Sequence, residues 1–262
     1  MGGNDLIIEC EAFKPKIASI QLIENSIIDI KPEKAILYSW LNSYVQNQKT
    51  RIAFDLDIIK NNIDIDKNIL EFGSVPLLLT NALVKTGYQV TGIDIAPERF
   101  NSTIKSLNIN IIKCDIERQR LPIEDNSYDL SVFNELFEHL RINPIFTMSE
   151  VLRVLKPSGI LLLSTPNLRS LKGIINFLFK NQAFSSSGDI FEEYEKLDKL
   201  GHMGHVREYT SDEVVKFLNK VGFNVEKLIF RGRYRLSRIP ASMFKLFPKL
   251  NPFITYFARK TG

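Results

Sequence analysis

Cysteine is scarce in this 262-residue sequence, and the shortage excludes two kinds of framework. The two cysteines, Cys10 and Cys114, lie far apart and match no metal-ligand spacing. A disulfide-stabilised secreted domain is therefore not expected. The sequence signatures of nucleophile-elbow hydrolases and of HExxH metalloproteases are also missing, and we expect no bound metal.

Long apolar runs are missing as well. No stretch approaches the roughly 20 residues that span a bilayer. The first residues, MGGNDLIIECEAF, lack the basic segment followed by an apolar one that marks a secretory signal. We therefore expect a cytoplasmic protein. Hydrophobic residues make up 44% of the chain and charged residues 24%, which is enough for a full apolar core.

Acidic residues are missing from residues 227–262, which carry nine lysines and arginines. The remaining residues hold 25 basic and 30 acidic side chains, so a basic tail follows a mildly acidic body. Arg231 and Tyr234 are typical of this tail, which suits phosphate groups of a lipid- or nucleotide-linked sugar, or an anionic membrane surface. A solvated face with a terminal segment packed on the core is the alternative. The acidic body argues against a nucleic-acid partner.

Residues 68–166 alternate between short apolar runs and segments of helical periodicity. The runs NILEFG, QVTGID, NIIKCD, YDLSVFN and ILLLSTPN predict strands, with helices between them. Such alternation predicts a doubly wound, mostly parallel α/β sheet with right-handed crossovers and helices on both faces.

The flanking segments are less regular. LIIE and IASIQLIE favour short strands, while residues 32–48 and 51–61 favour helices. Thr210 and Glu213 form a predicted capping box that opens a helix, and FNVEKLIF predicts a last strand. We expect four regions: a cap at 1–50, a Rossmann-like core at 51–167, a lid at 168–209, and at 210–262 the completion of the sheet with the basic aromatic tail.

Polar residues follow the ends of three successive predicted strands. Gly73 allows a ligand to approach the backbone closely after the first strand. Asp94 ends the second strand, where a carboxylate can accept hydrogen bonds from both hydroxyls of a ribose. Asp115 ends the third, where it can accept from an adenine amino group. Because ligands of open α/β sheets bind at the carboxyl ends of strands, these residues predict a nucleoside site. A tight turn at Gly73, a helix cap at Asp94 and a surface acid at Asp115 are the structural alternatives.

The motifs ILEFGS, VTGID, CDIE, LPIEDNSYDLSVFNELFEHL and EVLRVLKPSGILLLSTPN resemble, in order, those of class I S-adenosylmethionine-dependent methyltransferases. The small-molecule and glycan-modifying branches are the most similar. The resemblance covers residues 68–167, with a weaker similarity in HVREYTSDEVVKFLNKVGF. It implies a seven-stranded Rossmann-like sheet, S-adenosylmethionine as cofactor, and O- or N-methylation of a small molecule or glycan.

The resemblance also implies roles for individual residues. Glu71 anchors the methionine portion of the cofactor, Gly73 begins the glycine turn, Asp94 holds the ribose, Asp115 lies on the adenine side, and Asn134 borders the transferred methyl group. The neighbours included in the predicted cofactor site are Ser74, Ile95 and Ile116.

The turn departs from the family's Gly-x-Gly-x-Gly pattern. Val75 and Leu77 stand where the second and third glycines are usual, although Pro76 matches family members with a Gly-x-x-Pro turn. A branched side chain at Val75 would crowd the cofactor's amino-acid tail. A methyltransferase-like scaffold that has lost its cofactor is therefore one alternative. A nicotinamide-dependent oxidoreductase or epimerase is another, disfavoured because Gly-x-Gly-x-x-Gly and Tyr-x-x-x-Lys are missing.

Two histidines carry the hypotheses about catalysis. His205 follows Gly204 on a predicted loop, and we assign it as the general base, together with Asn134 as a catalytic residue; a surface loop is the alternative. His139 follows Glu135 and Glu138 in a string that resembles a metal-binding cluster of small-RNA 3′-terminal methyltransferases. The same string is widespread in metal-free relatives, so we predict local hydrogen bonding for His139.

Overall fold

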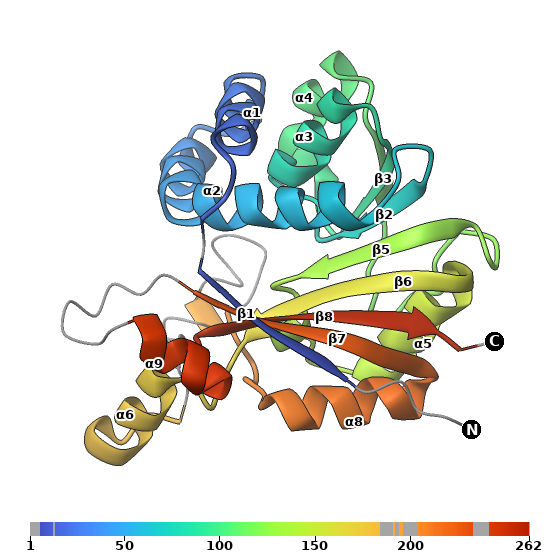
Figure 1. The fold of residues 1–262 in the computed structure, drawn as a ribbon. Helices are drawn as coiled ribbons and strands as arrows, with labels where there is room; N and C mark the ends of the chain where they lie inside the picture. Colours follow the sequence, from blue (N-terminus) through green and yellow to red (C-terminus); the bar gives the residue numbers. More distant parts are fainter. Residues whose placement is uncertain are drawn as a thin grey trace. The chain divides into compact units, whose positions relative to one another are not determined.

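The structure is a computed structural model that describes residues 6–12, 14–183, 191, 194–195, 204–232 and 241–261. The chain forms two compact units (Figure 1). Unit 1 comprises Met1–Ala12, Glu124–Asn126 and Phe133–Gly262, and unit 2 comprises Phe13–Ile123 and Ser127–Val132. The mostly parallel α/β fold predicted from the sequence is confirmed, with eight strands rather than seven among the described residues.

Unit 2 contains the parallel strands in the order β5-β2-β3-β4. Their bounds are β2 Asn68–Phe72, β3 Gln89–Asp94, β4 Asn110–Lys113 and β5 Tyr128–Asn134, the last two residues of β5 belonging to unit 1. The short η1 (Pro97–Phe100) and α4 (Asn101–Ser106) connect β3 to β4. These four strands agree with the sequence-based prediction because each is a short apolar run bounded by turn residues.

Three helices of unit 2 pack on one another: α1 (Ile17–Ile28), α2 (Ile36–Asn62) and α3 (Leu78–Thr86). The prediction of a strand in α1 was wrong. Ile23 and Ser19 are buried on one face of the helix, where Ser19 Oγ donates to Asp57 Oδ1 of α2 at 2.6 Å. The two predicted helices at 32–48 and 51–61 are one helix, since Lys49 and Thr50 include neither glycine nor proline.

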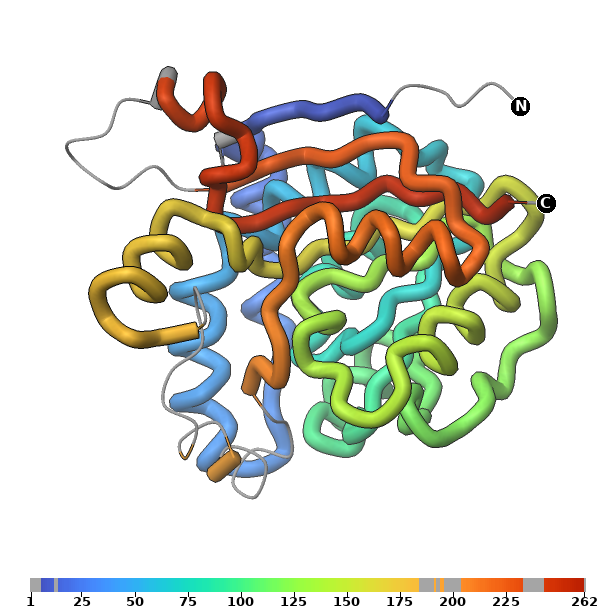
Figure 2. The backbone as a smooth tube through the Cα atoms, turned by 90° about the horizontal axis from the view of Figure 1, so that it is seen from below, coloured from blue at the N-terminus to red at the C-terminus, as the bar shows by residue number. Residues whose placement is uncertain are grey.

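Unit 1 contains strands in the order β1-β7-β8-β6, with β8 antiparallel to both neighbours. Their bounds are β1 Ile7–Ala12, β6 Leu155–Pro166, β7 Phe223–Gly232 and β8 Phe253–Lys260. Its helices are α5 (Pro144–Val154), α6 (Leu171–Lys180), α8 (Ser211–Val221) and α9 (Ala241–Leu246), with short turns η2 (Phe137–His139) and η3 (Pro248–Leu250). Figure 2 shows α8 running along β7, on which it packs.

The capping box at the start of α8 is confirmed. The Thr210 side chain accepts from the Glu213 backbone, and the Glu213 carboxylate accepts from the Thr210 backbone N–H at 2.9 Å. Gly222 ends the helix with φ of 116°. The helix therefore begins and ends where its sequence predicts.

The basic tail is partly a buried strand. Residues Ile254–Ala258 of β8 are buried between β6 and β7. Arg231, predicted to lie on a basic surface, is fully buried, because it lies in the part of β7 in which every residue is buried. Arg233, Tyr234, Arg235 and Arg238 lie outside the described residues.

The predicted lid at 168–209 is described only in part: α6 and residues 204–209 are included, whereas His202 is not.

In the part of the chain that the structure describes, no helix has both the length and the apolar character needed to cross a membrane.

Candidate functional site

The turn after β2 has the backbone conformation that the first glycine was expected to provide. Gly73 has φ of 66°, in the region that favours glycine, and its N–H donates to Ile93 O of β3 at 2.8 Å. The Ser74 N–H donates to the same carbonyl at 3.1 Å. Gly73 is exposed although the strand before it is buried. The backbone at Gly73 is therefore open to a ligand.

The Ser74 side chain lies so close to Gly92 that no larger residue fits at position 92. A Cβ atom on Gly92 would collide with Ile111 and would lie 2.7 Å from Ser74 Oγ. The Ser74 side chain is buried, and its Oγ has no hydrogen-bond partner among the described residues. A buried hydroxyl without a partner at the end of a strand is a suitable contact for a polar ligand atom.

The two residues that replace the usual glycines behave differently. Leu77 has φ of 71° and is completely buried at the start of α3, so a leucine occupies a backbone conformation that costs a non-glycine residue about 1–2 kcal/mol. Val75 is half-buried and its N–H donates to Asp94 Oδ2 at 3.1 Å. The turn in which Val75 and Leu77 replace glycines is therefore hydrogen-bonded to Asp94, the residue predicted to bind the ribose.

Asp94 ends β3 and is 7% exposed. Its other oxygen, Oδ1, accepts from Ala96 N at 2.8 Å and lies 3.4 Å from Arg99 Nη2. Burial raises the pKa of Asp94, whereas the hydrogen bonds from Ala96 and Val75 and the Arg99 charge lower it. Each carboxylate oxygen can accept two hydrogen bonds, so Oδ2, which accepts from Val75 N, keeps capacity for a ribose hydroxyl.

Glu71 lies inside β2, and its carboxylate accepts from Thr80 Oγ1 at 2.6 Å. Burial, together with the nearby acids Asp55 and Asp94, raises its pKa to about 8 against the lowering effect of the Thr80 hydrogen bond and the Arg51 charge. Arg51 and Asp55 form a buried ion pair of 3.0 Å on α2. This network places carboxylate and guanidinium groups where a ligand with both an ammonium and a carboxylate would find complementary charges.

The raised pKa of Glu71 predicts a pH dependence of cofactor binding. The ionised carboxylate attracts an ammonium group, so Glu71 must lose its proton when S-adenosylmethionine binds. Because its pKa is about 8 in the cofactor-free chain, affinity should rise by up to about tenfold per pH unit from pH 6 to 8 and then level off. Calorimetry across this range measures the effect, with Glu71→Gln as the variant whose affinity stays flat.

The same shift has a consequence for stability. Unfolded chains ionise Glu71 near its usual pKa of 4.5, whereas the folded chain holds the proton up to about 8. The stability of the cofactor-free protein should therefore decrease as pH rises through this window. Equal cofactor affinity at pH 6 and pH 8 in the unsubstituted protein would contradict the assignment of Glu71.

The third strand end carries Asp115, whose side chain is 23% exposed. Its Oδ1 accepts from Glu117 N at 3.1 Å, and the preceding Cys114 N–H donates to Asp94 O at 3.0 Å. Ile95 is an apolar side chain with 45% exposure directly after Asp94, and Ile116 is half-buried. The predicted residues of unit 2 therefore gather at the carboxyl ends of β2, β3 and β4. An exposed glycine turn, a partnerless buried hydroxyl and acids on adjacent strands fit S-adenosylmethionine.

Asn134 and Glu135 follow in unit 1, at the end of β5. The Asn134 amide is buried, and neither its Oδ1 nor its Nδ2 has a hydrogen-bond partner among the described residues. Glu135 has φ of 51°, unusual for a residue other than glycine, and its N–H donates to Ser164 O at 2.8 Å. Strained backbone and unsatisfied buried amides concentrate at functional sites.

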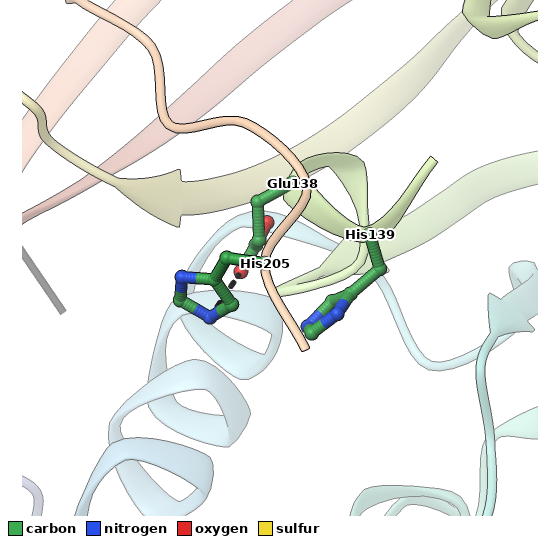
Figure 3. Close-up of side chains that lie close together, drawn as sticks. All are labelled: Glu138, His139 and His205. Carbon is green, nitrogen blue, oxygen red and sulfur yellow. Dashed lines mark ion pairs between the residues drawn. The ribbon is translucent and has the colours of Figure 1, made fainter. Parts of the chain in front are cut away.

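Glu138, His139 and His205 form a cluster, which we call the Glu–His cluster (Figure 3). One ligand atom from each lies within 4.8 Å of the others. His205 Nε2 is 3.9 Å from Glu138 Oε1, and the two imidazole rings are 5.0 Å apart in an edge-on arrangement. Val206 N donates to Glu138 O at 2.8 Å, which ties the segment of His205 to η2.

Acidic neighbours control the charge of His205. Burial lowers its pKa, but the hydrogen bond to Glu208 and the charges of Glu138 and Glu135 outweigh burial, so the net pKa is raised. Its Nδ1 lies 3.2 Å from Glu208 Oε1. Burial also raises the pKa of Glu138. The sequence-based assignment of His205 as a base stays a prediction, now with an orienting carboxylate.

Several residues near the predicted cofactor site and near the Glu–His cluster were not singled out from the sequence. Arg51 and Asp55 interrupt an apolar stretch, RIAFDLDII, which was the available signal for a buried charged pair. Glu208 lies three residues after His205, but nothing in the sequence indicates that it is buried. Arg231 was predicted to lie at the surface, because its partner Glu135 is distant in sequence.

Comparison with known proteins agrees with this geometry. Residues 70–163 match a family model described as a methyltransferase domain. No curated protein sequence matches the chain.

Solved structures with similar folds include S-adenosylmethionine-dependent methyltransferases from three organisms. The Thermotoga maritima protein has 15% identity and a TM-score of 0.56, covering 90% of this chain and 98% of its own. The Archaeoglobus fulgidus protein has 16% identity and a TM-score of 0.55, covering 83% and 99%. The Methanosarcina mazei protein has 19% identity and a TM-score of 0.53, covering 78% and 97%.

Proposed function

We propose that this chain, a class I S-adenosylmethionine-dependent methyltransferase with its methyltransferase domain at residues 70–163, methylates a hydroxyl group of a small molecule or glycan. The observation that carries the choice of acceptor is the His205 imidazole, oriented by Glu208 through Nδ1 at 3.2 Å. The methyltransferase match supports this reading over the nicotinamide-dependent oxidoreductase, and cofactor binding distinguishes it from the scaffold.

The residues of unit 2 would hold the cofactor. Asp94 binds the ribose hydroxyls, Glu71 and Arg51 bind the charged amino-acid portion, Ser74 supplies a hydroxyl, and Asp115 lies on the adenine side. When bound, S-adenosylmethionine supplies an activated methyl group on a sulfonium centre. The chain itself aligns the groups and handles the proton.

A hydroxyl acceptor needs a group that takes its proton, whereas a neutral amine attacks through its own lone pair. His205 lies among Glu208, Glu138 and Glu135, which stabilise the imidazolium that forms when the ring accepts a proton. The buried Asn134 amide supplies both a donor and an acceptor for orienting the acceptor hydroxyl. These groups favour oxygen as the methylated atom.

An acceptor linked to a lipid would fit the surface of unit 1. Phe177, Leu178 and Phe179 at the end of α6 are 68%, 64% and 80% exposed, and Leu246 and Phe247 at the end of α9 are 74% and 54% exposed. Figures 1 and 2 both place α6 and α9 at the same end of this unit. Exposed lysines accompany these apolar residues: Lys172, Lys180 and Lys245. Aromatic side chains beside lysines are typical of segments that bind anionic membrane surfaces.

Membrane binding is tested with vesicles. The full chain should bind vesicles that contain phosphatidylserine, and binding should weaken as salt is raised because part of the attraction is ionic. The double variant Phe177→Ser with Phe179→Ser should lower the partition coefficient at least about tenfold, since each buried phenylalanine contributes roughly 1.5–3 kcal/mol. Sedimentation of vesicles measures the bound fraction.

The matched control is Ile17→Ser with Ile36→Ser, two exposed isoleucines of unit 2 at 75% and 64% exposure. Equal loss of binding in both double variants, or no binding by the unsubstituted chain at low salt, would contradict the lipid-linked acceptor.

The reaction itself is tested by transfer of a labelled methyl group to a panel of acceptors. The panel pairs each hydroxylated sugar, free, phosphorylated or lipid-linked, with the amino sugar of the same ring. We expect labelled methyl ethers that resist mild acid and base. Methylation of amino sugars alone would overturn the choice of oxygen, and cofactor binding without any transfer would overturn the acceptor classes.

A further inference from the structure

We propose that Trp40 and Tyr44, in the first half of α2 in unit 2, are a stacking site for a sugar ring of the acceptor. We call this pair the aromatic platform. The inference rests on the proposed function, which leaves the acceptor as a small molecule or a glycan, and it narrows that choice to a glycan. No motif of the sequence indicated these two residues.

The two aromatic rings are neighbours on one face of the helix. Tyr44 follows Trp40 by four residues, and their ring centroids are 5.5 Å apart with an interplanar angle of 32°. Both side chains are half-buried, whereas Leu37 and Leu41 of the same helix are buried. The leucines supply the apolar packing of this half of α2. The rings therefore keep part of their surface exposed.

Polar side chains continue the same face of the helix. Residues 40, 44, 48, 51 and 55 follow one another at intervals of three or four, so their side chains share one face. Arg51 Nε donates to Gln48 Oε1 at 2.9 Å, and Arg51 Nη2 lies 3.5 Å from Tyr44 Oη. Because the Gln48 carbonyl oxygen accepts from Arg51, the Nε2 group with its two N–H donors is the part of the amide that binds a ligand hydroxyl.

This combination of groups selects a sugar as the ligand. The face of an aromatic ring is negatively polarised, and the C–H groups of a sugar ring are positively polarised, so the two surfaces stack. The hydroxyls at the edge of the sugar ring then need polar partners beside the aromatic rings, and the Gln48 amide and the Tyr44 hydroxyl supply them. An apolar ligand would leave these polar groups unsatisfied, and a phosphate group would make no use of the rings.

The helix connects the aromatic platform to the predicted cofactor site. Arg51 and Asp55 form the buried ion pair of 3.0 Å; Arg51 lowers the pKa of Glu71, the residue predicted to hold the cofactor's amino-acid portion, and Asp55 raises it. With a rise of about 1.5 Å per residue, Tyr44 lies about 10 Å and Trp40 about 16 Å from Arg51 along the helix axis. This separation is longer than one sugar ring. The stacked ring and the methylated ring are therefore different sugars of one glycan.

Tryptophan fluorescence tests the aromatic platform directly. Trp40 is the only tryptophan of the chain, so its emission reports on this position alone. A stacked sugar removes water from the indole ring, which shifts the emission to shorter wavelength. The full chain, with and without S-adenosylhomocysteine, is titrated with the methyl glycosides of glucose, galactose, mannose and rhamnose and with disaccharides of the same sugars. We expect a saturable shift in the millimolar range, with a disaccharide binding more tightly than its monosaccharide.

Variants of the same helix separate stacking from hydrogen bonding. Tyr44→Ala removes one ring and should weaken sugar binding about tenfold, whereas Tyr44→Phe keeps the ring and should weaken it by less. Gln48→Ala leaves both rings and should weaken binding about fivefold, as expected for one lost hydrogen bond. Tyr38→Ala is the matched control, because Tyr38 is a tyrosine of α2 with 46% exposure outside this face, and its loss should leave binding unchanged. Circular dichroism shows which variants are folded.

The outcomes distinguish the aromatic platform from the proposed function. No shift with any of these sugars, or equal affinity in the unsubstituted chain, Tyr44→Ala and Gln48→Ala, overturns the platform. A saturable shift of the same size with benzyl alcohol shows an aromatic ligand and overturns the choice of a sugar. Sugar binding that Tyr44→Ala weakens, without methyl transfer to any hydroxyl, overturns only the proposed function.

Discussion

Methyl transfer by the His205→Ala variant should be slower by about 10²–10⁴ with the acceptor saturating, which is the usual contribution of a group that handles a proton in the transition state. The affinity for S-adenosylmethionine should stay within about twofold, because the predicted cofactor contacts are made by other residues. A loss confined to kcat would place His205 at the chemical step rather than in cofactor binding. Transfer of a labelled methyl group, with cofactor affinity measured by calorimetry, checks both quantities.

A matched substitution at His139 is the control. If His205 is the base, His139→Ala retains most of the activity. Turnover by His205→Ala at the rate of the unsubstituted protein would contradict the assignment.

The Asp94→Ala variant should bind S-adenosylmethionine at least about 100-fold more weakly, corresponding to about 2.7 kcal/mol. Two hydrogen bonds from ribose hydroxyls to a carboxylate would be lost, and hydrogen bonds to charged groups contribute roughly 1.5–3 kcal/mol each. Titration of S-adenosylmethionine and S-adenosylhomocysteine into the chain measures the change, with NAD as a ligand that should not bind.

Asp94 also stabilises the turn, so a second variant is needed. Asp94 accepts from Val75 N and Ala96 N, and an alanine at this position removes these bonds as well. Asp94→Asn keeps one side-chain acceptor and most of the shape, and should separate loss of ribose contacts from loss of the turn. Glu98→Gln, an acid with 52% exposure in the next turn, is the control. Unchanged affinity in Asp94→Ala would remove Asp94 from the site.

The sequence predicted the strands of unit 2 and the acids at their ends because these features are local. A strand end is marked by a few neighbouring residues, and an acid at that point is brought to the common edge by parallel pairing alone. Asp94 and Asp115 are therefore found without knowledge of any distant contact. The register in which Asp94 of β3 pairs with Lys113 of β4 follows from the same short segments.

The features that the sequence did not predict depend on distant contacts. The strand β8 was not expected, because its aromatic and basic residues show their burial only when β6 and β7 lie on either side. Arg231 was placed at the surface because arginine is usually exposed, and Glu135, the half-buried acid near it, lies almost 100 residues earlier. The helix α1 was mistaken for a strand because its burial depends on contacts with α2 and α3, which lie outside the segment.

The position of β8 between β6 and β7 also affects when the chain can fold during synthesis. Strands β2 to β4 pair with near neighbours in sequence, so they can associate while the ribosome is still adding residues. β7 is made some 60 residues after β6, and the edge of each that pairs with β8 stays open until residues 253–260 have emerged. Until then, two apolar strands expose unpaired edges, and a nascent chain paused before residue 253 would be a target for chaperones and for aggregation.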